Sequence, residues 1–310
     1  MFFYILKRVF YAIPTLLIII TLAFFMMRLA PGGPFDTERQ LPPEIEANIL
    51  KSYNLDKPLY EQYFIYVDHL VHFDFGPSYK YRDFSVTELI ESGLPASMKI
   101  GGLAILLATL IGILLGILAA LNQNKRLDYF IMSVAMTGIA IPNFVIAPVL
   151  SLILGVYLSW LPVGGWGNGD LHHIILPVFC LALPQIAYIA RLCRGSMVEI
   201  LHSNFVTTAR AKGLRERIVV FRHALKGGLL PVITFLGPAI ASITTGSVVI
   251  ESIFDIPGIG RYFVNGALNR DYPLVMGVVV FYAALIIFLN LAVDIIYSFI
   301  DPKLKLGDRK

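Results

Sequence analysis

Charged residues are scarce in this chain. Asp, Glu, Lys and Arg make up 15% of its 310 residues, against about 25% in typical soluble domains. Apolar residues account for 57% and occur in long runs. This composition excludes a water-soluble globule and indicates an integral membrane protein. The net charge of +4 does not indicate nucleic-acid binding, because the basic residues lie beside apolar runs, where membrane topology accounts for them.

Cysteine is also scarce. Cys180 and Cys193 fall in one apolar run, and in a single helix they would lie about 20 Å apart along the axis, which excludes a disulfide between them. No CxxC pair is present. Asp170, His172 and His173 share a glycine-rich stretch but lack the spacing of a third ligand. We therefore expect no metal site and interpret that stretch as a solvated loop.

Sequence motifs for energy conversion and catalysis are missing. The chain has no GxxxxGK[ST], HExxH, GxSxG or dinucleotide-binding glycine pattern. Acids and bases are sparse within the apolar runs, which argues against a carrier driven by protons or sodium through intramembrane carboxylates. We expect a non-enzymatic chain that binds no cofactor.

Apolar runs long enough for transmembrane helices are present instead. Six are predicted, at residues 9–29, 98–121, 130–157, 174–193, 228–250 and 274–298. The first is too long for a signal peptide. Lys and Arg concentrate in the segments 1–8, 122–128, 191–227 and 301–310, which places both termini in the cytoplasm. The prediction is an all-α polytopic membrane protein with six transmembrane helices.

The chain divides into four parts on this basis. We expect a cytoplasmic N-terminus and first span over 1–30, an extracytoplasmic insertion over 31–97, a five-span domain over 98–300 with a cytoplasmic loop at 194–227, and a tail at 301–310. The insertion should be helical, because its aromatic residues near Tyr63 recur at helical spacing. Ser85 and Glu88 have the spacing of a capping box.

Small and polar residues within the spans give further candidates. Gly112 and Gly116 are four apart, which lets two helices approach closely. Polar or helix-breaking residues that could line a pathway are Pro142, Asn143, Gln185, Thr234, Ser242 and Thr245. The alternative for Pro142 and Asn143 is a plain kink with a helix–helix hydrogen bond. Candidates for an outer gate are Glu251, Pro257 and Gly258.

The stretch 191–231 is the largest polar cytoplasmic feature. It carries eight Lys or Arg residues and two acids. Ser203 and Asn204 can begin a helix, Gly213 can end it, and Glu216–Ala224 can form another. Two short helices of this kind suit docking to a partner. The alternative is an amphipathic helix lying on anionic lipid, and composition does not choose between them.

Thr208-Ala-Arg-Ala-Lys-Gly213-Leu, with Arg222-His-Ala-Leu and Leu230-Pro231, resembles the coupling motif of type I ABC importer permeases. The spacing is similar to that of the dipeptide/oligopeptide/nickel permease group. Thr207, Thr208 and Ala209 stand where the general motif has Glu-Ala-Ala, a departure which that group shares. RLAPGGPFD, AIPNF, SWLPVGGW and GSVVIESIFDIPGIG extend the resemblance over nearly the whole chain.

The resemblance implies a permease subunit of a bacterial inner-membrane importer for oligopeptides. Its partners would be a homologous second permease, two ABC ATPases that bind ATP-Mg, an extracytoplasmic peptide-binding protein, the peptide and the lipid bilayer, with no nucleic acid. The coupling helix would span 203–213, with contact residues Val206, Thr207, Thr208, Ala209, Arg210, Ala211, Lys212 and Gly213. The return arm to the fifth span would include Arg222, His223, Leu230 and Pro231.

The cargo has alternatives. The same architecture would serve a dipeptide, nickel, glutathione or an oligosaccharide. An ATP-independent channel or carrier, or a membrane enzyme, is a further alternative, which the missing intramembrane acids and catalytic pairs disfavour.

Overall fold

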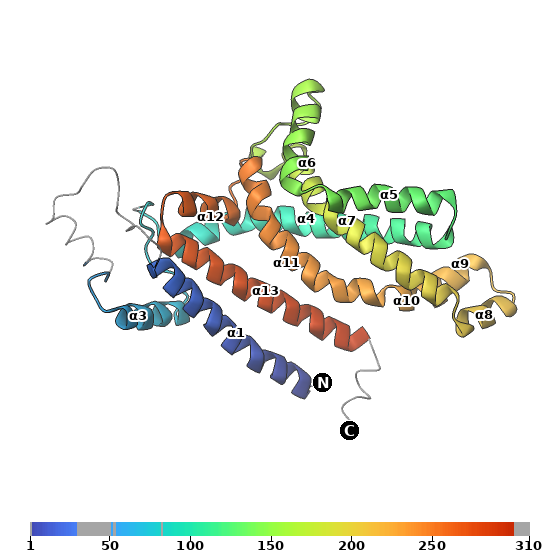
Figure 1. Cartoon of the computed structure of the whole chain (residues 1–310), viewed down its shortest axis with the longest axis horizontal. Coiled ribbons are helices and arrows are strands. Elements are labelled where there is room, and N and C mark those ends of the chain that lie inside the picture. Colours follow the sequence, from blue (N-terminus) through green and yellow to red (C-terminus); the bar gives the residue numbers. More distant parts are fainter. Residues whose placement is uncertain (1, 30–50, 52–53, 82, 301–310) are drawn as a thin grey trace.

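The computed structural model describes residues 2–29, 51, 54–81 and 83–300. Within these ranges the chain is helical, and the β-type pairing is an isolated bridge between Pro77 and Ser85. The helices, shown in Figure 1, are α1 (Phe2–Leu29), α3 (Leu59–Val71), α4 (Val86–Leu121), α5 (Arg126–Ala140), α6 (Asn143–Leu150), α7 (Leu171–Leu201), α8 (Asn204–Ala211), α9 (Glu216–Ile218), α10 (Leu225–Gly228), α11 (Leu230–Ile253), α12 (Ile259–Leu268) and α13 (Tyr272–Ile300). π-helical turns at Ser151–Tyr157 and Val219–Ala224 follow α6 and α9.

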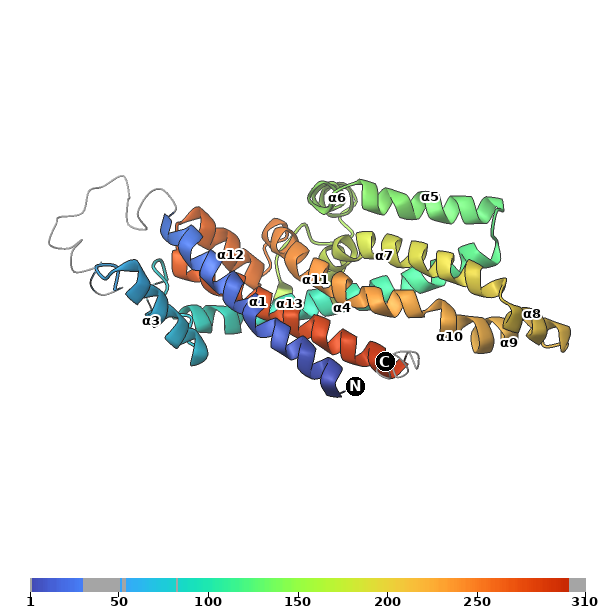
Figure 2. The ribbon, with the colours of Figure 1, turned by 60° about the horizontal axis from the view of Figure 1, so that its bottom comes forward.

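Five helices of the described chain, α1, α4, α7, α11 and α13, are long and apolar enough to cross a membrane. A sixth candidate is α5 together with Asn143–Tyr157, two pieces that bend by 101° at a short break. The all-α fold with six apolar spans is thereby confirmed when the bent pair counts as one span. Figure 1 shows α6 rising away from α5, and Figure 2 shows α6 nearly end-on.

The third span is broken rather than continuous. Ile141 has an extended backbone (φ −98°, ψ 121°), as expected for a residue before proline. Pro142 has no amide hydrogen to donate to α5. The kink expected over 130–157 is therefore a sharp change of direction between two helices.

A stripe of small side chains joins α4 to α7. Ala96, Ala104, Ala108, Gly112, Gly116 and Ala120 recur at intervals of four or eight residues and are buried. A Cβ atom on Gly116 would lie 2.5 Å from Cβ of Cys193 and 2.8 Å from the carbonyl oxygen of Ala190. The two backbones thus approach as closely as the Gly112/Gly116 pattern indicates.

Two helices extend past the expected span ends. α4 begins at Val86, so the boundary expected between 97 and 98 falls inside one helix. The capping box at its start is confirmed, since the Ser85 hydroxyl accepts from the Glu88 amide and the Glu88 carboxylate accepts from the Ser85 amide. α7 continues to Leu201, beyond the expected start of the loop at 194.

The described part of the insertion packs on α1. Tyr63 of α3 hydrogen-bonds Thr21 at 2.8 Å, and its ring lies 5.4 Å from that of Phe24. α1 runs antiparallel beside α13, with the start of α1 near the end of α13 in both ribbon views (Figure 1, Figure 2). Residues 31–50, 52–53 and 82 of the expected insertion, and the expected tail at 301–310, lie outside the described residues.

The α4–α7 interface gives a first testable prediction. Gly116→Ala should destabilise the protein by about 1–3 kcal/mol, because the added methyl group meets the backbone and side chain of α7. Gly102→Ala on the same helix is the matched control, since a Cβ there meets no heavy atom within 4 Å. The measurement is the Tm of the detergent-purified protein. Equal Tm values for the two variants would contradict the close approach.

Candidate functional site

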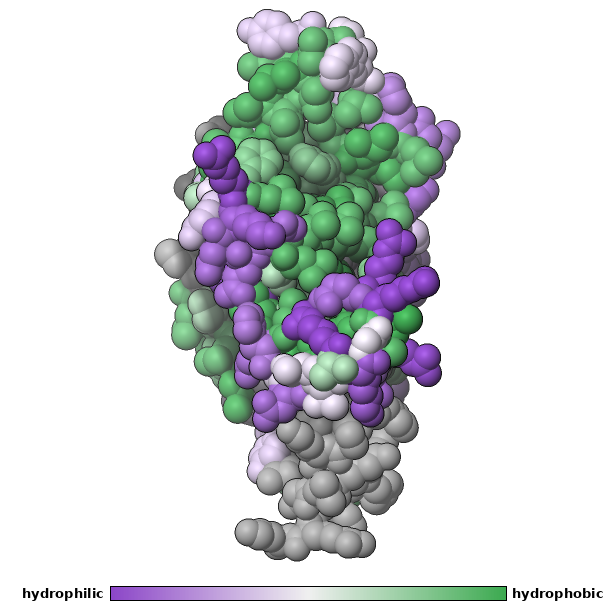
Figure 3. All heavy atoms as spheres, turned by 90° about the vertical axis from the view of Figure 1, so that its right-hand side faces the viewer, coloured by the Kyte–Doolittle hydropathy of each residue, from purple (hydrophilic) through white to green (hydrophobic). Residues whose placement is uncertain are grey.

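α7 carries a short helical element beyond the membrane. Its 31 residues span about 46 Å at 1.5 Å per residue, more than the hydrocarbon thickness of about 30 Å. α8 follows after a break of two residues, and α8 and α9 lie together at one end of the molecule (Figure 1). Viewed from that end, hydrophilic side chains gather across the face next to hydrophobic surface (Figure 3).

α8 has one face turned to its own chain and one turned outward. Val206 is fully buried and Ala209 is 5% exposed. Thr207, Thr208 and Ala211 are exposed. The hydroxyls of both threonines donate to backbone carbonyls one turn earlier, so their hydrogen bonds are made within this short segment. The eight expected contact residues therefore divide into an anchoring pair and an exposed set.

Arg210 joins three elements at this site. Its guanidinium donates to both carboxylate oxygens of Glu216, at 2.6 and 3.2 Å, and to the carbonyl oxygen of Leu201 at 3.1 Å. These bonds connect α8 to the start of α9 and to the end of α7. The guanidinium hydrogen bonds lower the pKa of the Glu216 carboxyl, so the pair is ionised at neutral pH. Both side chains are more than one-third exposed, and solvent screens their attraction.

Gly213 ends the element through its backbone conformation. Its φ of +77° lies in the left-handed region, and a Cβ there would meet no heavy atom within 4 Å. Glycine is therefore favoured by the backbone conformation of the turn and not by crowding. The Gly213 amide donates to the carbonyl of Arg210 at 2.9 Å, which closes the turn after α8.

Ion pairing and packing hold α7 to its neighbours near the same end. Arg194 donates to both oxygens of Asp128, at 2.5 and 2.6 Å, and the Asp128 side chain is 1% exposed. Asp128 also accepts from the backbone amide of Asn124. On the other side, the Ser196 hydroxyl donates to the carbonyl of Gly228. Together these contacts connect α7 to α5 and α10.

The expected return-arm residues lie mostly on the surface of the turn into α11. Arg222 and Pro231 are exposed, and His223 shares a hydrogen bond of 3.3 Å with the carbonyl of Ile218. Pro231 stands in the first turn of α11, where its missing amide hydrogen has no helical partner to lose. The residues that pack this arm inward are instead Val219, Val220 and Ala224.

The structure brings together two of the six pathway candidates. Gln185 of α7 donates to the hydroxyl of Ser242 on α11 at 3.1 Å. The side-chain oxygens of Gln185 and Asn143 are buried without a partner among the described residues. Thr234 is exposed and bonds its own helix, Pro142 lies at the break, and the side chain of Thr245 is outside the described residues.

The outer-gate candidates lie at the end of α11. Glu251 is fully buried and accepts from the amide of Gly260 at 2.7 Å. Gly258 lies so close to Glu251 and Ser97 that a Cβ atom would clash with both, and Pro257 precedes it in the turn to α12. The Ser97 hydroxyl accepts from the amide of Ile259 at 2.9 Å. Glu251 therefore ties the start of α12 to the end of α11.

A second buried carboxylate at this end was not predicted. Asp271 accepts from the Ser78 hydroxyl and from the amides of Tyr79 and Leu274. It connects the segment before α4 to the start of α13. The sequence offers little indication of this role, because Asp271 precedes Tyr-Pro in a segment typical of an ordinary loop. Arg210 was predicted as a contact residue for a partner. Its hydrogen bonds to Glu216 were not predicted, because the two residues lie on either side of the turn at Gly213 and share no helical spacing.

Comparison with known proteins identifies the family. Residues 112–306 match the family "Binding-protein-dependent transport system inner membrane component", and residues 1–92 match its N-terminal region. The oligopeptide transport system permease protein OppB of Salmonella typhimurium is 55% identical over 97% of this chain and 99% of its own length. OppB of Escherichia coli is 54% identical with the same coverage. The dipeptide transport system permease protein DppB of Bacillus subtilis is 44% identical over 98% of both chains. The chain therefore belongs to the family of binding-protein-dependent transport system inner membrane components, as a multi-pass permease subunit.

Proposed function

We propose that this chain is one permease subunit of an ATP-driven importer that moves oligopeptides across the bacterial inner membrane. The observation that carries the proposal is α8, a short helix fixed at the end of α7 with Thr207, Thr208 and Ala211 exposed. The full-length similarity to the named oligopeptide permeases supports the cargo, and the dipeptide permease is a more distant relative.

ATP hydrolysis belongs to partner subunits in this proposal. Two ABC ATPases bind ATP-Mg, a homologous second permease completes the pathway, and an extracytoplasmic binding protein delivers peptide. α8 sits against one ATPase with its exposed face, whereas Val206 and Ala209 keep it on its own chain. Movement of the ATPase pair then displaces α8, and Arg210 transmits that displacement to α7 and α9.

Gln185 and Ser242 are the pathway candidates best placed to respond. They join α7 to α11 by one hydrogen bond, so relative movement of the two helices would break it. At the outer end, Glu251 and Gly258 hold α12 against α11.

Reconstitution tests the transport proposal. The assembled transporter in proteoliposomes should accumulate a labelled oligopeptide when ATP and the binding protein are supplied. Vesicles with the permease subunits alone should show no uptake, because this chain carries no P-loop motif. Excess unlabelled oligopeptide should suppress the signal and nickel should not. Uptake without the ATPases, or competition by nickel alone, would contradict the proposal.

The turn at Gly213 tests the coupling role. Gly213→Val should reduce oligopeptide uptake more than tenfold, because a β-branched residue strongly disfavours φ of +77°. Gly213→Asn should keep most activity, because asparagine tolerates this conformation. The matched control is Gly195→Val, at an exposed α7 position where a Cβ meets no heavy atom within 4 Å.

Membrane insertion of all three variants is measured in the same cells by immunoblot of the membrane fraction. Normal insertion with lost uptake for Gly213→Val alone is the expected pattern. Wild-type uptake by Gly213→Val would refute the coupling role of this turn.

A further inference from the structure

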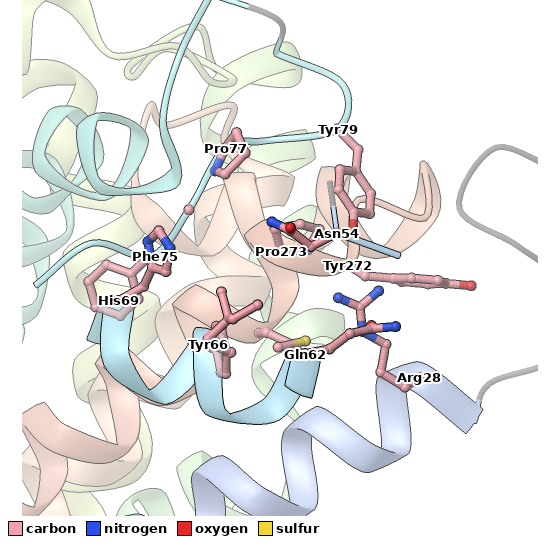
Figure 4. A pocket seen from close by; sticks show the side chains of 13 residues that line it. Arg28, Asn54, Gln62, Tyr66, His69, Phe75, Pro77, Tyr79, Tyr272 and Pro273 are labelled. Atoms are coloured by element: carbon pink, nitrogen blue, oxygen red, sulfur yellow. The ribbon is translucent and has the colours of Figure 1, made fainter. Parts of the chain in front are cut away.

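A pocket lies at the opposite end of the molecule from α8. It is a cavity of about 250 Å³ between the end of α1, α3, the segment around Pro77 and the start of α13. The Arg28 side chain rises from α1 into it, toward Gln62 of α3 and Tyr272 of α13 (Figure 4). The cavity is smaller than the 300–1,000 Å³ common for small-molecule sites, so it suits a small polar ligand or headgroup.

Three polar atoms on residues that line this cavity have no hydrogen-bond partner among the described residues. They are Nε of Arg28, Oε1 of Gln62 and the hydroxyl of Tyr66, and all three are buried. The other end of the Gln62 amide is engaged, because Nε2 donates to the carbonyls of Leu55 and Lys57. Its Oε1 is thereby held in place as an acceptor. Buried polar atoms without partners are uncommon in folded proteins, and three on residues that line one cavity make it a candidate binding site.

The unpartnered atoms define the chemistry of that ligand. Arg28 and Tyr66 are donors, since burial raises the pKa of the Tyr66 phenol and keeps it protonated. Gln62 Oε1 is an acceptor. A ligand that satisfied all three atoms would carry an acceptor oxygen, which the arginine charge favours as an anion, and beside it a hydroxyl or ammonium donor. A phosphodiester headgroup with a glycerol or ethanolamine end meets both requirements, and arginine is well suited to phosphate.

Depth in the membrane favours a lipid as its source. The span Arg8–Leu29 has 22 residues, about 33 Å at 1.5 Å per residue, so Arg28 lies at the outer boundary of the hydrocarbon region. α3 packs against α1 one to two turns below Arg28, through Thr21 and Phe24.

The outward face of α3 carries aromatic and apolar side chains beside Asp68 and His72, which are 76% and 71% exposed. Tyr60, Phe64 and Val71 are 62%, 66% and 70% exposed. Aromatic residues concentrate at the membrane interface, and an amphipathic helix can lie in it with its apolar face toward the acyl chains. The cavity that Arg28 lines therefore stands at headgroup level.

We propose that this pocket binds the headgroup of an outer-leaflet phospholipid, with its phosphate on Arg28 and Tyr66 and its hydroxyl or ammonium on Gln62. The bound headgroup would hold α3 and the end of α1 to the start of α13. The site is independent of the cargo and of the coupling role of α8. A peptide carboxylate has related chemistry, but the position of Arg28 at the end of the span Arg8–Leu29 favours a lipid headgroup.

Native mass spectrometry of the assembled, delipidated transporter tests the site. The probe is phosphatidylglycerol, with diacylglycerol of the same acyl chains as the phosphate-free comparison. Wild type should bind one phosphatidylglycerol molecule that diacylglycerol does not replace. Arg28→Gln and Tyr66→Phe should each weaken that binding about tenfold or more, as expected for a lost charge-assisted or buried hydrogen bond. Tyr66→Phe keeps the ring packing and guards against a folding defect in the arginine variant.

Two variants outside the pocket serve as controls. Tyr60→Phe alters an exposed tyrosine of the same helix, and Lys80→Ala removes an exposed cation near the same end. Both should bind phosphatidylglycerol as wild type does. Unchanged binding by Arg28→Gln and Tyr66→Phe, or displacement of the lipid by an oligopeptide at the same site, would overturn the proposal.

Discussion

The close approach of α4 and α7 is the constraint on which the rest of the structure depends. Glycine and alanine along one side of α4 bring the two backbones so near that a single methyl group at Gly116 would collide with α7. In a lipid environment such contact is a main source of helix association, because apolar side chains gain little by leaving the acyl chains. The pair forms a stiff support that extends past the membrane at the end where α8 is attached.

Polar bonding is placed at the two ends of this support, with different chemistry at each. At the α8 end, Arg194 with Asp128 and Arg210 with Glu216 use charge pairs that water reaches in part. At the other end, Glu251 and Asp271 are fully buried and accept from backbone amides and hydroxyls. Amides that donate to a buried carboxylate fix a turn in one geometry. At the outer end, these bonds hold the starts of α12 and α13 to neighbouring segments. At the inner end, α8 leaves Thr207, Thr208 and Ala211 exposed, as a surface that binds a partner requires.

Much of this architecture could be predicted from the sequence, for identifiable reasons. Apolar length located the spans, four-residue spacing predicted the approach at Gly112 and Gly116, and Ser85 with Glu88 predicted the start of α4. Gly213 was recognised as a turn because few other residues accept a positive φ. Each of these signals depends on residues that are close in the sequence, so a single sequence is enough to detect it.

The remaining features depend on contacts between distant residues. Arg210 and Glu216 meet across a turn, Gln185 and Ser242 meet across two helices, and Asp271 bonds Ser78 from the other end of the chain. The break at Pro142 was expected as a kink, but its 101° bend depends on how α6 packs. The cavity at Arg28 likewise needs α1, α3 and α13 together.

The division of α8 into an anchoring face and an exposed face is the central claim, and cysteine cross-linking tests it most directly. In the assembled transporter, Ala211→Cys and Thr208→Cys would be paired with cysteines introduced in the ATPase, with Val206→Cys as the buried comparison. The native Cys180 and Cys193 are fully buried and should stay silent. The account predicts cross-links from positions 208 and 211, changing in yield when ATP is bound, and none from 206. Cross-linking from 206 alone, or from none of the three, would contradict it.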